Sequence, residues 1–583
     1  MNTMKKYINK VVILGLTTVL CLTSSCADFL SRPPQSSFTD DNFWVSEDNV
    51  EAFSYGLYNE FYGYGRGSGT YGEFYWQVQG SNTNMLYTDD LLNNTFLTLP
   101  NSVSASNSKW KEYYEDIRKA NLMLARIPNV PMTDVAKKNW EGVAKFFRAN
   151  MYFALVTAFG DVPYVDKYMG PDEKDLYVNR TDRKIIIDNI IADLQFAAAN
   201  ITLKKDDAIN NDCANALLAR IALFEGSYRK YHKLGESDIY FKTAETAANA
   251  IITSPRGYAL SSDYKAKFNS INLKGNPEII FYKRYEKEIL THSVQNYTHT
   301  STVINGLTKA AVESYACTDG LPIGQIGSSY KGDKGIDNIL ANRDKRLLAA
   351  IYPELGYRGH LIQKAHPTIK GQLQSTTGYV VSMFDNKENG TDVTTGGQNH
   401  IDAPIYTLSE AYLIYAEAKA ELKTLAQDDL DKTINLLRDR AGIARLTLAG
   451  ENVSANGIAI NDPKRTATLE TQTMGGVVSP ILWEIRRERR AELMTWIMLR
   501  YQDILRWGKG EYLDFAKNPD VALGAWIGNT SKDITVNTDG YILFYPKNSN
   551  NFESPKHYLN SIPNNEKLLF SAEGIDLGQN KDW

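Results

Sequence analysis

The side chains in this sequence that could carry out chemistry are a carboxylate pair, a glycine-rich segment and a cluster of arginines. Asp89 and Asp90 lie in an aromatic-rich stretch, and two carboxylates at a defined separation across a cleft can hydrolyse a glycosidic bond. Their spacing along the chain does not reveal such a separation. Residues 67–72 match the GxGxxG pattern of nucleotide-binding loops, but no buried strand precedes them and no helix follows. We therefore expect no phosphate-binding loop there.

The arginine cluster occupies positions 486–490, in the order Arg-Arg-Glu-Arg-Arg. On a helix, Glu484 and Arg487 are three residues apart, and so are Arg489 and Glu492. We therefore predict that these residues form ion pairs on a partly solvated helix face. The whole chain balances 64 Lys and Arg against 68 Asp and Glu, so its charge does not favour nucleic-acid binding.

Other motifs with a known mechanism are missing from the sequence. There is no Walker, HExxH, GxSxG or CxxC pattern, and the seven histidines are scattered without the spacing of metal ligands. We predict no catalytic residue, no metal site and no cofactor. The chain is 43% hydrophobic and holds 35 tyrosines, so it is not a disordered chain. Tyrosine can staple helices or grip an amphipathic ligand, because it joins an apolar ring to a polar tip.

Helices must position most of these side chains. Apolar residues recur at steps of three and four in long stretches, with Pro128 and Pro131 between the second and third of them. The predicted helices begin near Ser46 and Trp110 and cover 134–159, 183–199, 211–231, 409–425, 428–441 and 482–507. The stretches 62–109, 253–404 and 443–480 read as long loops, with a short strand-like run at 278–282. The expected fold is therefore an irregular helical array with functional loops.

The N-terminus has the layout of a secretory signal. Lys5, Lys6 and Lys10 precede an apolar run over 11–22, and small residues then lead to Cys26. This is the pattern of a bacterial lipoprotein, so we predict a signal peptide at 1–25 and lipidation of Cys26. Cys213 and Cys317 also remain in the mature chain, and the sequence leaves open whether they pair.

Several motifs together resemble the SusD/RagB family of outer-membrane lipoproteins, over essentially the whole chain. They are Cys-Ala-Asp-Phe-Leu at 26–30, Trp110 to Asn121, Phe-Arg-Ala to Gly-Asp-Val-Pro at 147–163, Tyr-Ala-Cys-Thr-Asp-Gly at 315–320, Arg-Asp-Lys-Arg-Leu at 343–347, Tyr-Ala-Glu-Ala at 415–418, Glu-Arg-Arg-Ala-Glu-Leu at 488–493, Asp503 to Trp507, and the closing Gln-Asn-Lys-Asp-Trp at 579–583. Residues 495–500 depart from the family pattern with about one extra residue, so we expect a bulge or a shift in helix register there.

The resemblance implies a mainly α fold, in which about four tetratricopeptide-like helix pairs support a loop-rich ligand-binding side with a few short strands. It implies one domain over 26–583, with a helical part at about 26–250 and a SusD/RagB part at about 270–583. The implied function is non-catalytic capture of glycans at the cell surface, with delivery to a TonB-dependent transporter of SusC type in the outer membrane. Capture of peptides, or cleavage of glycans by an enzyme, are the alternatives.

The resemblance also places the ligand contacts in two windows. One follows the first helix, and the other precedes residues 315–320. Within them, Trp76, Phe96 and Tyr297 could stack on sugar rings, and Asp89, Asn93 and Asn94 could bind hydroxyl groups. The full candidate set is Tyr75, Trp76, Tyr87, Asp89, Asn93, Asn94, Phe96, Tyr285, Asn296 and Tyr297.

Overall fold

The computed structural model describes residues 40–583, apart from short segments and single positions. These exceptions are residues 66–87, 94–98, 171–175, 203–206, 300–304, 358–359, 364–373, 387, 389, 391–396, 495, 497–498, 529–533 and 545–550. The predicted signal peptide 1–25, the lipidation site Cys26 and the glycine-rich segment 67–72 therefore lie outside the described residues.

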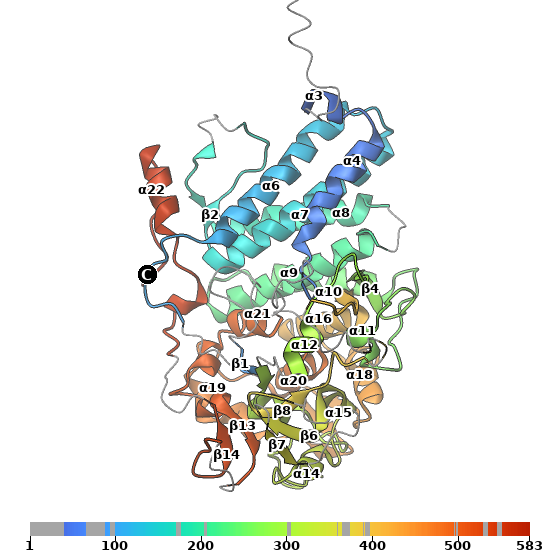
Figure 1. Cartoon of the computed structure of the whole chain (residues 1–583), viewed down its shortest axis with the longest axis vertical. Coiled ribbons are helices and arrows are strands. Elements are labelled where there is room, and N and C mark those ends of the chain that lie inside the picture. Colours follow the sequence, from blue (N-terminus) through green and yellow to red (C-terminus); the bar gives the residue numbers. More distant parts are fainter. Residues whose placement is uncertain are drawn as a thin grey trace, which may run out of the picture.

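A stack of helices forms the scaffold, and each helix packs against at least one other member (Figure 1). Its members are α4 (Glu47–Ser54), α6 (Ser108–Arg126), α7 (Asp134–Phe159), α8 (Arg183–Asn200), α9 (Asn211–Tyr231), α10 (Asp238–Ile252), α16 (Leu408–Glu421), α17 (Gln427–Asp431), α18 (Ile434–Ala441), α20 (Pro480–Glu492) and α21 (Leu499–Arg506). The predicted mainly α, tetratricopeptide-like fold is confirmed. Helix α10, which lies against α9 and α16, was not predicted.

Local signals set several of these helix boundaries. The side chain of Ser46 caps α4 by accepting a hydrogen bond from the backbone N–H of Asn49, at 3.3 Å. Thr133 caps α7 in the same way, and Gly160 ends it with a φ of 72°, a value that favours glycine. The helices predicted at 134–159 and 211–231 agree with the observed bounds of α7 and α9.

Two predicted helices are interrupted. The helix expected at 428–441 is divided into α17 and α18, because the Thr433 hydroxyl donates to the carbonyl of Asp429 and its backbone leaves the helical conformation. The helix expected at 482–507 is divided into α20 and α21, in the region where the sequence predicted a bulge or shift. Between them, the indole Nε1 of Trp496 donates to the carbonyl oxygen of Pro404 at 3.1 Å.

The strands are short and all their pairings are antiparallel. They are β1 (Leu91–Asn93) with β5 (Asn305–Leu307), β2 (Val162–Pro163) with β3 (Arg180–Thr181), β4 (Ile279–Lys283) with β9 (Ala403–Thr407), β6 (Ile351–Tyr357) with β7 (His360–Gln363) and β8 (Gly378–Val381), β10 (Leu446–Ala449) with β11 (Asn452–Ala455), β11 with β12 (Ile458–Ala459), and β13 (Leu523–Trp526) with β14 (Tyr541–Leu543).

Short helices complete the described structure. They are α3 (Asp40–Phe43), α11 (Ala266–Asn269), α12 (Val294–His299), α13 (Lys309–Ser314), α14 (Ile336–Leu340), α15 (Lys345–Ala350), α19 (Thr468–Gln472), α22 (Asn564–Ala572), and the 3₁₀ turns η1 (Tyr55–Glu60), η2 (Ile127–Asn129), η5 (Pro463–Thr466), η6 (Gly510–Leu513), η7 (Pro519–Ala522) and η8 (Lys556–Tyr558). None of the helices in the described ranges has the length and hydrophobicity needed to cross a bilayer.

The arginine cluster on α20 is buried, which corrects the prediction of a partly solvated face. Arg487 does pair with Glu484, at 3.1 Å. Arg489 instead pairs with Asp503 on α21, at 2.8 Å, while Glu492 accepts from Lys267 and Arg440. Helix α20 packs against α16 and other elements, so distant partners replace the expected local ones. Cys213 and Cys317 are both buried and unpaired.

Candidate ligand-binding site

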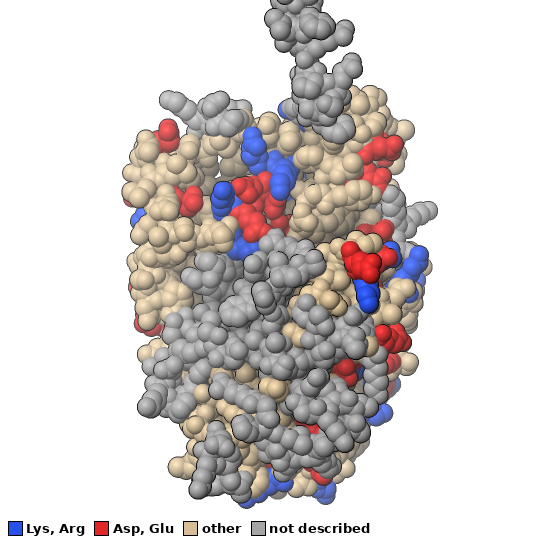
Figure 2. All heavy atoms as spheres, viewed as in Figure 1, with Lys and Arg blue, Asp and Glu red and all other residues tan. Residues whose placement is uncertain are grey.

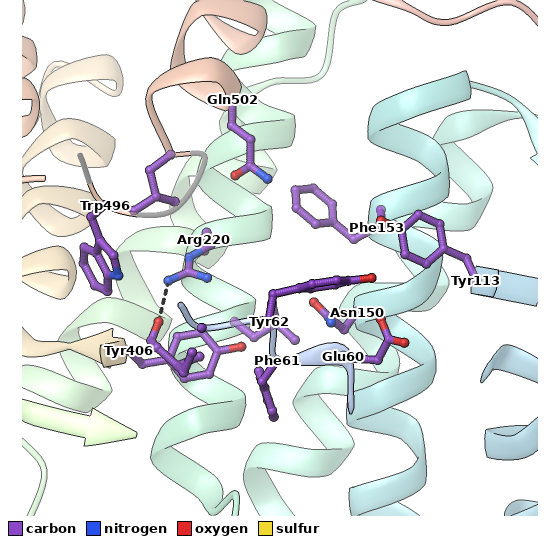
Figure 3. Close-up of a pocket in the computed structure, with 15 residues that line it drawn as sticks. Glu60, Phe61, Tyr62, Tyr113, Asn150, Phe153, Arg220, Tyr406, Trp496 and Gln502 are labelled. Carbon is purple, nitrogen blue, oxygen red and sulfur yellow. Dashed lines mark hydrogen bonds between the residues drawn. The ribbon is translucent and has the colours of Figure 1, made fainter. Parts of the chain in front are cut away.

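A pocket of about 130 Å³ lies between the helical scaffold and the C-terminal half of the chain (Figure 3). We call it the aromatic pocket. Its walls come from η1 and the residues after it, from α6, α7, α9 and α21, from β9, and from Trp496 between α20 and α21. It is lined by Glu60, Phe61, Tyr62, Gly63, Tyr113, Asn150, Phe153, Ala154, Leu217, Arg220, Ile405, Tyr406, Trp496, Leu499 and Gln502.

Three half-buried side chains reach the accessible part of the aromatic pocket: Tyr62, Asn150 and Arg220. The Tyr62 ring extends across the pocket toward Asn150 and Glu60 (Figure 3). Arg220 is held by Glu410, which accepts from Nε at 2.7 Å and from Nη2 at 2.6 Å, and its guanidinium lies 4.8 Å from the centre of the Tyr406 ring. The pocket therefore offers fixed hydrogen-bonding groups beside aromatic rings.

The floor of the aromatic pocket is rigid. The ring of Phe61 packs 5.7 Å from that of Phe147 and 5.0 Å from that of Phe281. Such centroid separations are typical of stabilising aromatic pairs. Trp496 is 3% exposed and is fixed by its hydrogen bond to Pro404. Closely packed rings of this kind keep the pocket's shape without a ligand.

Glu60 is the unusual ionisable group of the pocket. Burial raises its pKa well above the ordinary value, and a hydrogen bond with Asp116 raises it further. Asp116 in turn pairs with Lys119 at 2.5 Å. Within the described part of the chain, Glu60 Oε1 has no hydrogen-bond partner. A protonated Glu60 can donate a hydrogen bond to a ligand.

Charged side chains also cover the outer surface near Glu60. Figure 2 shows acidic side chains flanked by basic ones over the region of α6. On that helix Lys109 pairs with Glu112 at 2.7 Å, and Lys111 lies 3.7 Å from Glu115. These pairs neutralise one another, so this face carries no strong charge of one sign.

Tyr285, one of the predicted contacts, anchors the start of segment 66–87. Its hydroxyl donates to the carbonyl of Gly65 at 2.6 Å and accepts from the backbone N–H groups of Tyr64 and Gly65, at 2.8 and 2.9 Å. The residue is only 3% exposed. A Cβ on Gly63 would lie 2.7 Å from the Tyr285 hydroxyl, and the φ of Gly63 is +56°, so this approach needs glycine.

Asp89, another predicted contact, anchors the end of the same segment. Its two carboxylate oxygens each accept from Arg500 at 2.7 Å, and Arg490 lies 3.0 Å away. Burial opposes ionisation of Asp89, but the two arginines outweigh burial and lower its pKa to about 2. The Asp89 side chain is 3% exposed. It binds arginines on α20 and α21 and does not line the aromatic pocket.

The remaining predicted contacts divide into two groups. Asn296 lies in α12, is 3% exposed, and its backbone N–H donates to the side chain of Asn399 at 3.2 Å. The backbones of Asn93 and Tyr297 lie in β1 and α12. The others fall outside the described residues, and they are Tyr75, Trp76, Tyr87, Asn94 and Phe96. Of the predicted side chains that the structure describes, Asp89, Tyr285 and Asn296, none lines the aromatic pocket.

Sequence reasoning missed the residues that do line the pocket. Tyr113 was assigned to helix packing, and Arg220, Asn150 and Gln502 were not singled out. They come from four distant parts of the chain, so no local spacing connects them. Trp496 did carry a signal, since it lies where the sequence departs from the family pattern. In the described part of the chain, no three His, Cys, Asp or Glu side chains gather as metal ligands would.

Family comparisons match both halves of the chain. A model of the SusD family matches residues 277–574. A second model, described as starch-binding associating with outer membrane, matches residues 28–223. SusD-like protein P38 of Formosa agariphila is 27% identical over 299 residues, which are 49% of this chain and 55% of that protein. The chain thus spans about half the length of this curated relative.

Solved structures share the fold over most of the chain. A SusD-like carbohydrate-binding protein from Bacteroides fragilis superposes with a TM-score of 0.67 at 21% identity, covering 90% of this chain and 99% of that one. A laminarin-binding SusD-like protein superposes with a TM-score of 0.58 at 16% identity, covering 93% and 100%. At these identities the likeness establishes the fold alone.

Proposed function

The chain belongs to the SusD family, and from that premise we propose that it captures a glycan and does not cleave it. The observation that carries the proposal is the aromatic pocket, where Tyr62, Asn150 and Arg220 present a ring, an amide and a guanidinium side by side. Sugars are bound by aromatic faces together with planar hydrogen-bonding groups. Two SusD-like proteins of the same fold are named for the ligands they bind, one for carbohydrate and one for laminarin, and these names support the same ligand class.

The volume of the pocket limits what it can hold. Pockets that enclose a whole small ligand usually measure about 300–1,000 Å³. A pocket of about 130 Å³ therefore suits a single group of a larger ligand. We propose that the rest of the glycan contacts the two predicted windows, with Trp76, Phe96 and Tyr297 stacking and Asn93 and Asn94 binding hydroxyls. Tyr285 and Asp89 then act as anchors of segment 66–87.

Delivery of the glycan requires attachment to a membrane. We propose that the signal at 1–25 is removed, that Cys26 is acylated, and that the lipid holds the chain at the outer membrane, facing outward. A TonB-dependent transporter of SusC type is the proposed partner. The description of the matching N-terminal family model, which mentions the outer membrane, supports this location.

Calorimetry tests the proposed glycan capture. Laminarin, starch and a panel of other neutral polysaccharides are titrated into the purified chain, and one or more are expected to bind without release of reducing ends. Asn150→Ala removes one hydrogen-bonding group and should weaken binding about three- to tenfold, since such a bond contributes about 0.5–1.5 kcal/mol. Trp76→Ala should weaken it by a similar factor through lost stacking.

Asn189→Ala provides the matched control. Asn189 is a half-buried helical asparagine on α8 that does not line the pocket, so its variant should bind like the wild type. Binding of peptides with no binding of any glycan would replace glycan capture by the peptide alternative. Release of shortened sugars from a bound polysaccharide would instead establish an enzyme.

A further inference from the structure

A second cavity, of about 370 Å³, lies in the C-terminal half, among α13, η5, α19, α20, α21, η6 and the residues before η7. Helix α21 borders both cavities, with Leu499 and Gln502 in the aromatic pocket and Arg500 in this one, but the two linings share no residue. Figure 1 shows α19 and α20 below helices α6 to α9. We call it the arginine cavity. Its size falls within the range that encloses a small-molecule ligand.

The arginine cavity has a buried floor, half-buried walls and an exposed rim. Its floor includes Trp507 and Lys509, which are 2% and 1% exposed. Its walls include the rings of Trp483 and Tyr512, and its rim includes the exposed Lys464. The indole Nε1 of Trp483 donates to Asp462 at 2.9 Å, so the orientation of this ring is fixed. The cavity therefore offers fixed aromatic surface between charged groups.

Positive charge exceeds negative charge in the lining. Seven Lys or Arg side chains line the cavity against five Asp or Glu. The cations are Lys464, Arg486, Arg487, Arg490, Arg500, Lys509 and Lys517, and the anions are Asp89, Glu313, Asp462, Glu470 and Asp520.

Four of the five lining carboxylates, all but Asp520, are already paired with cations of the chain. Asp89 accepts two hydrogen bonds from Arg500. Glu470 accepts from Lys509 at 2.5 Å and from the hydroxyl of Tyr512. Since a guanidinium has five N–H donors and a carboxylate only acceptors, the arginine-rich lining holds more donors than these acceptors use. A ligand that brings acceptors fits this lining better than one that brings donors.

Arg486 is the donor with the clearest unmet capacity. It is 6% exposed, and its Nε has no hydrogen-bond partner among the described residues. Its Nη2 donates to Glu421 at 3.3 Å, and its guanidinium lies 4.4 Å from the ring of Trp507 and 4.7 Å from that of Tyr231. The side chain is thus held in place between two rings. A buried donor without an acceptor is costly, and an anionic oxygen from a ligand would satisfy it.

We propose that the arginine cavity binds an acidic saccharide unit, with its carboxylate or sulfate ester on Arg486 and its sugar ring against Trp483. The negative group supplies the acceptor that Arg486 lacks, and the ring matches the aromatic wall and the volume. This inference rests on the proposed glycan capture, and it adds that the captured glycan carries acidic residues.

The test uses the purified mature chain and four probes in calorimetry: trigalacturonate, glucose 6-sulfate, neutral maltotriose and sodium sulfate. One or both acidic sugars should bind, and the pair distinguishes a carboxylate from a sulfate ligand. Arg486→Gln should weaken that binding at least tenfold, and rising salt should weaken it as well. Arg445→Gln is the control, because this substitution removes the same charge from a half-exposed residue that lines neither cavity.

Trp483→Leu is a second variant, for use if Arg486→Gln does not fold, because Trp483 is only half-buried. Its loss should weaken the binding of acidic sugars but not the binding of sodium sulfate. Failure of both acidic sugars to bind, or unchanged binding in both variants, would overturn the proposal. Sodium sulfate binding as tightly as the acidic sugars would reduce the cavity to an anion site and overturn its saccharide part. Asn150→Ala separates the two sites: it should weaken neutral glycans and leave acidic probes unaffected.

Discussion

Replacing Glu417 by glutamine should destabilise the protein strongly. Glu417 on α16 accepts from Arg506 Nη1 at 2.6 Å, from Arg506 Nη2 at 2.8 Å and from the indole of Trp507 at 2.8 Å. Its side chain is fully buried, and that of Arg506 is 2% exposed. Glutamine has a similar shape but no charge, so among the described residues it would leave Asp503 as the one anionic partner of a buried guanidinium.

The expected loss can be calculated in two ways. Breaking a buried ion pair by removing one partner costs about 3–5 kcal/mol. Independently, burial disfavours ionised Glu417, but Arg506 with Arg489 and Arg486 outweighs burial and lowers its pKa from 4.5 to about 2. A shift of that size corresponds to about 3 kcal/mol of stability. Because the folded-state pKa is lowered, this stability is present above pH 4.5 and is lost as the pH falls toward 2.

Equilibrium unfolding in urea at several pH values measures this loss. At pH 7, Glu417→Gln should lower the free energy of unfolding by about 3–5 kcal/mol. The gap to the wild type should narrow at pH 3, where the wild type has itself lost part of the stability. Glu236→Gln is the control: that side chain is 61% exposed and lies 3.7 Å or more from its partners, so it should change stability by less than about 0.5 kcal/mol. A change below 1 kcal/mol for Glu417→Gln, or a gap independent of pH, would refute the reasoning.

Three further predictions concern the pocket, its loop and the membrane. Glu60 has a raised pKa, so its contribution to stability is complete below pH 4.5 and is lost as the pH rises through the folded-state pKa. Between pH 5 and pH 9, the melting temperature of the wild type should therefore fall relative to that of Glu60→Gln. A difference in melting temperature that does not change with pH would contradict this. Tyr285→Phe removes the hydroxyl that accepts from the backbone N–H of Tyr64, and the Gly65 N–H keeps only its bond to the Tyr62 carbonyl, so hydrogen exchange of the Tyr64 amide should accelerate and glycan affinity should fall, whereas unchanged exchange would exclude the anchoring role. Cys26→Ala should yield a folded chain in the soluble fraction, and its persistence in membrane pellets would count against lipidation.

Local sequence signals predicted the scaffold where they were complete. Helix α7 combines an apolar repeat with Thr133 as its N-cap and Gly160 at its end, so its bounds could be read directly. Helix α10 carried the same kind of repeat, with Tyr240, Ala244 and Ala248 buried, and was still missed. At the break between α20 and α21, Trp496 contacts Pro404, 92 residues earlier in the chain. Periodicity cannot reveal such a distant contact.

The candidate site was less accessible to sequence reasoning for the same reason. The family resemblance predicts ligand contacts in the windows around Asp89 and Tyr285, among their polar and aromatic residues. Sequence does not reveal whether such a side chain binds a ligand or another part of the chain. Asp89 binds Arg500, 411 residues away, and Tyr285 binds Gly65, 220 residues away. Both side chains are thus engaged by distant parts of the chain.

The ion pairs of Asp89 also determine which arginine a ligand in the arginine cavity can use. Arg500 and Arg490 line that cavity, but both are bound to Asp89, where segment 66–87 rejoins the described chain. An incoming carboxylate at Arg500 would have to displace a buried carboxylate whose pKa is only about 2, which means that its ionised form is strongly stabilised. Arg486 presents no such competition at Nε. An acidic sugar is therefore expected to bind at Arg486 and to leave the anchor of segment 66–87 intact.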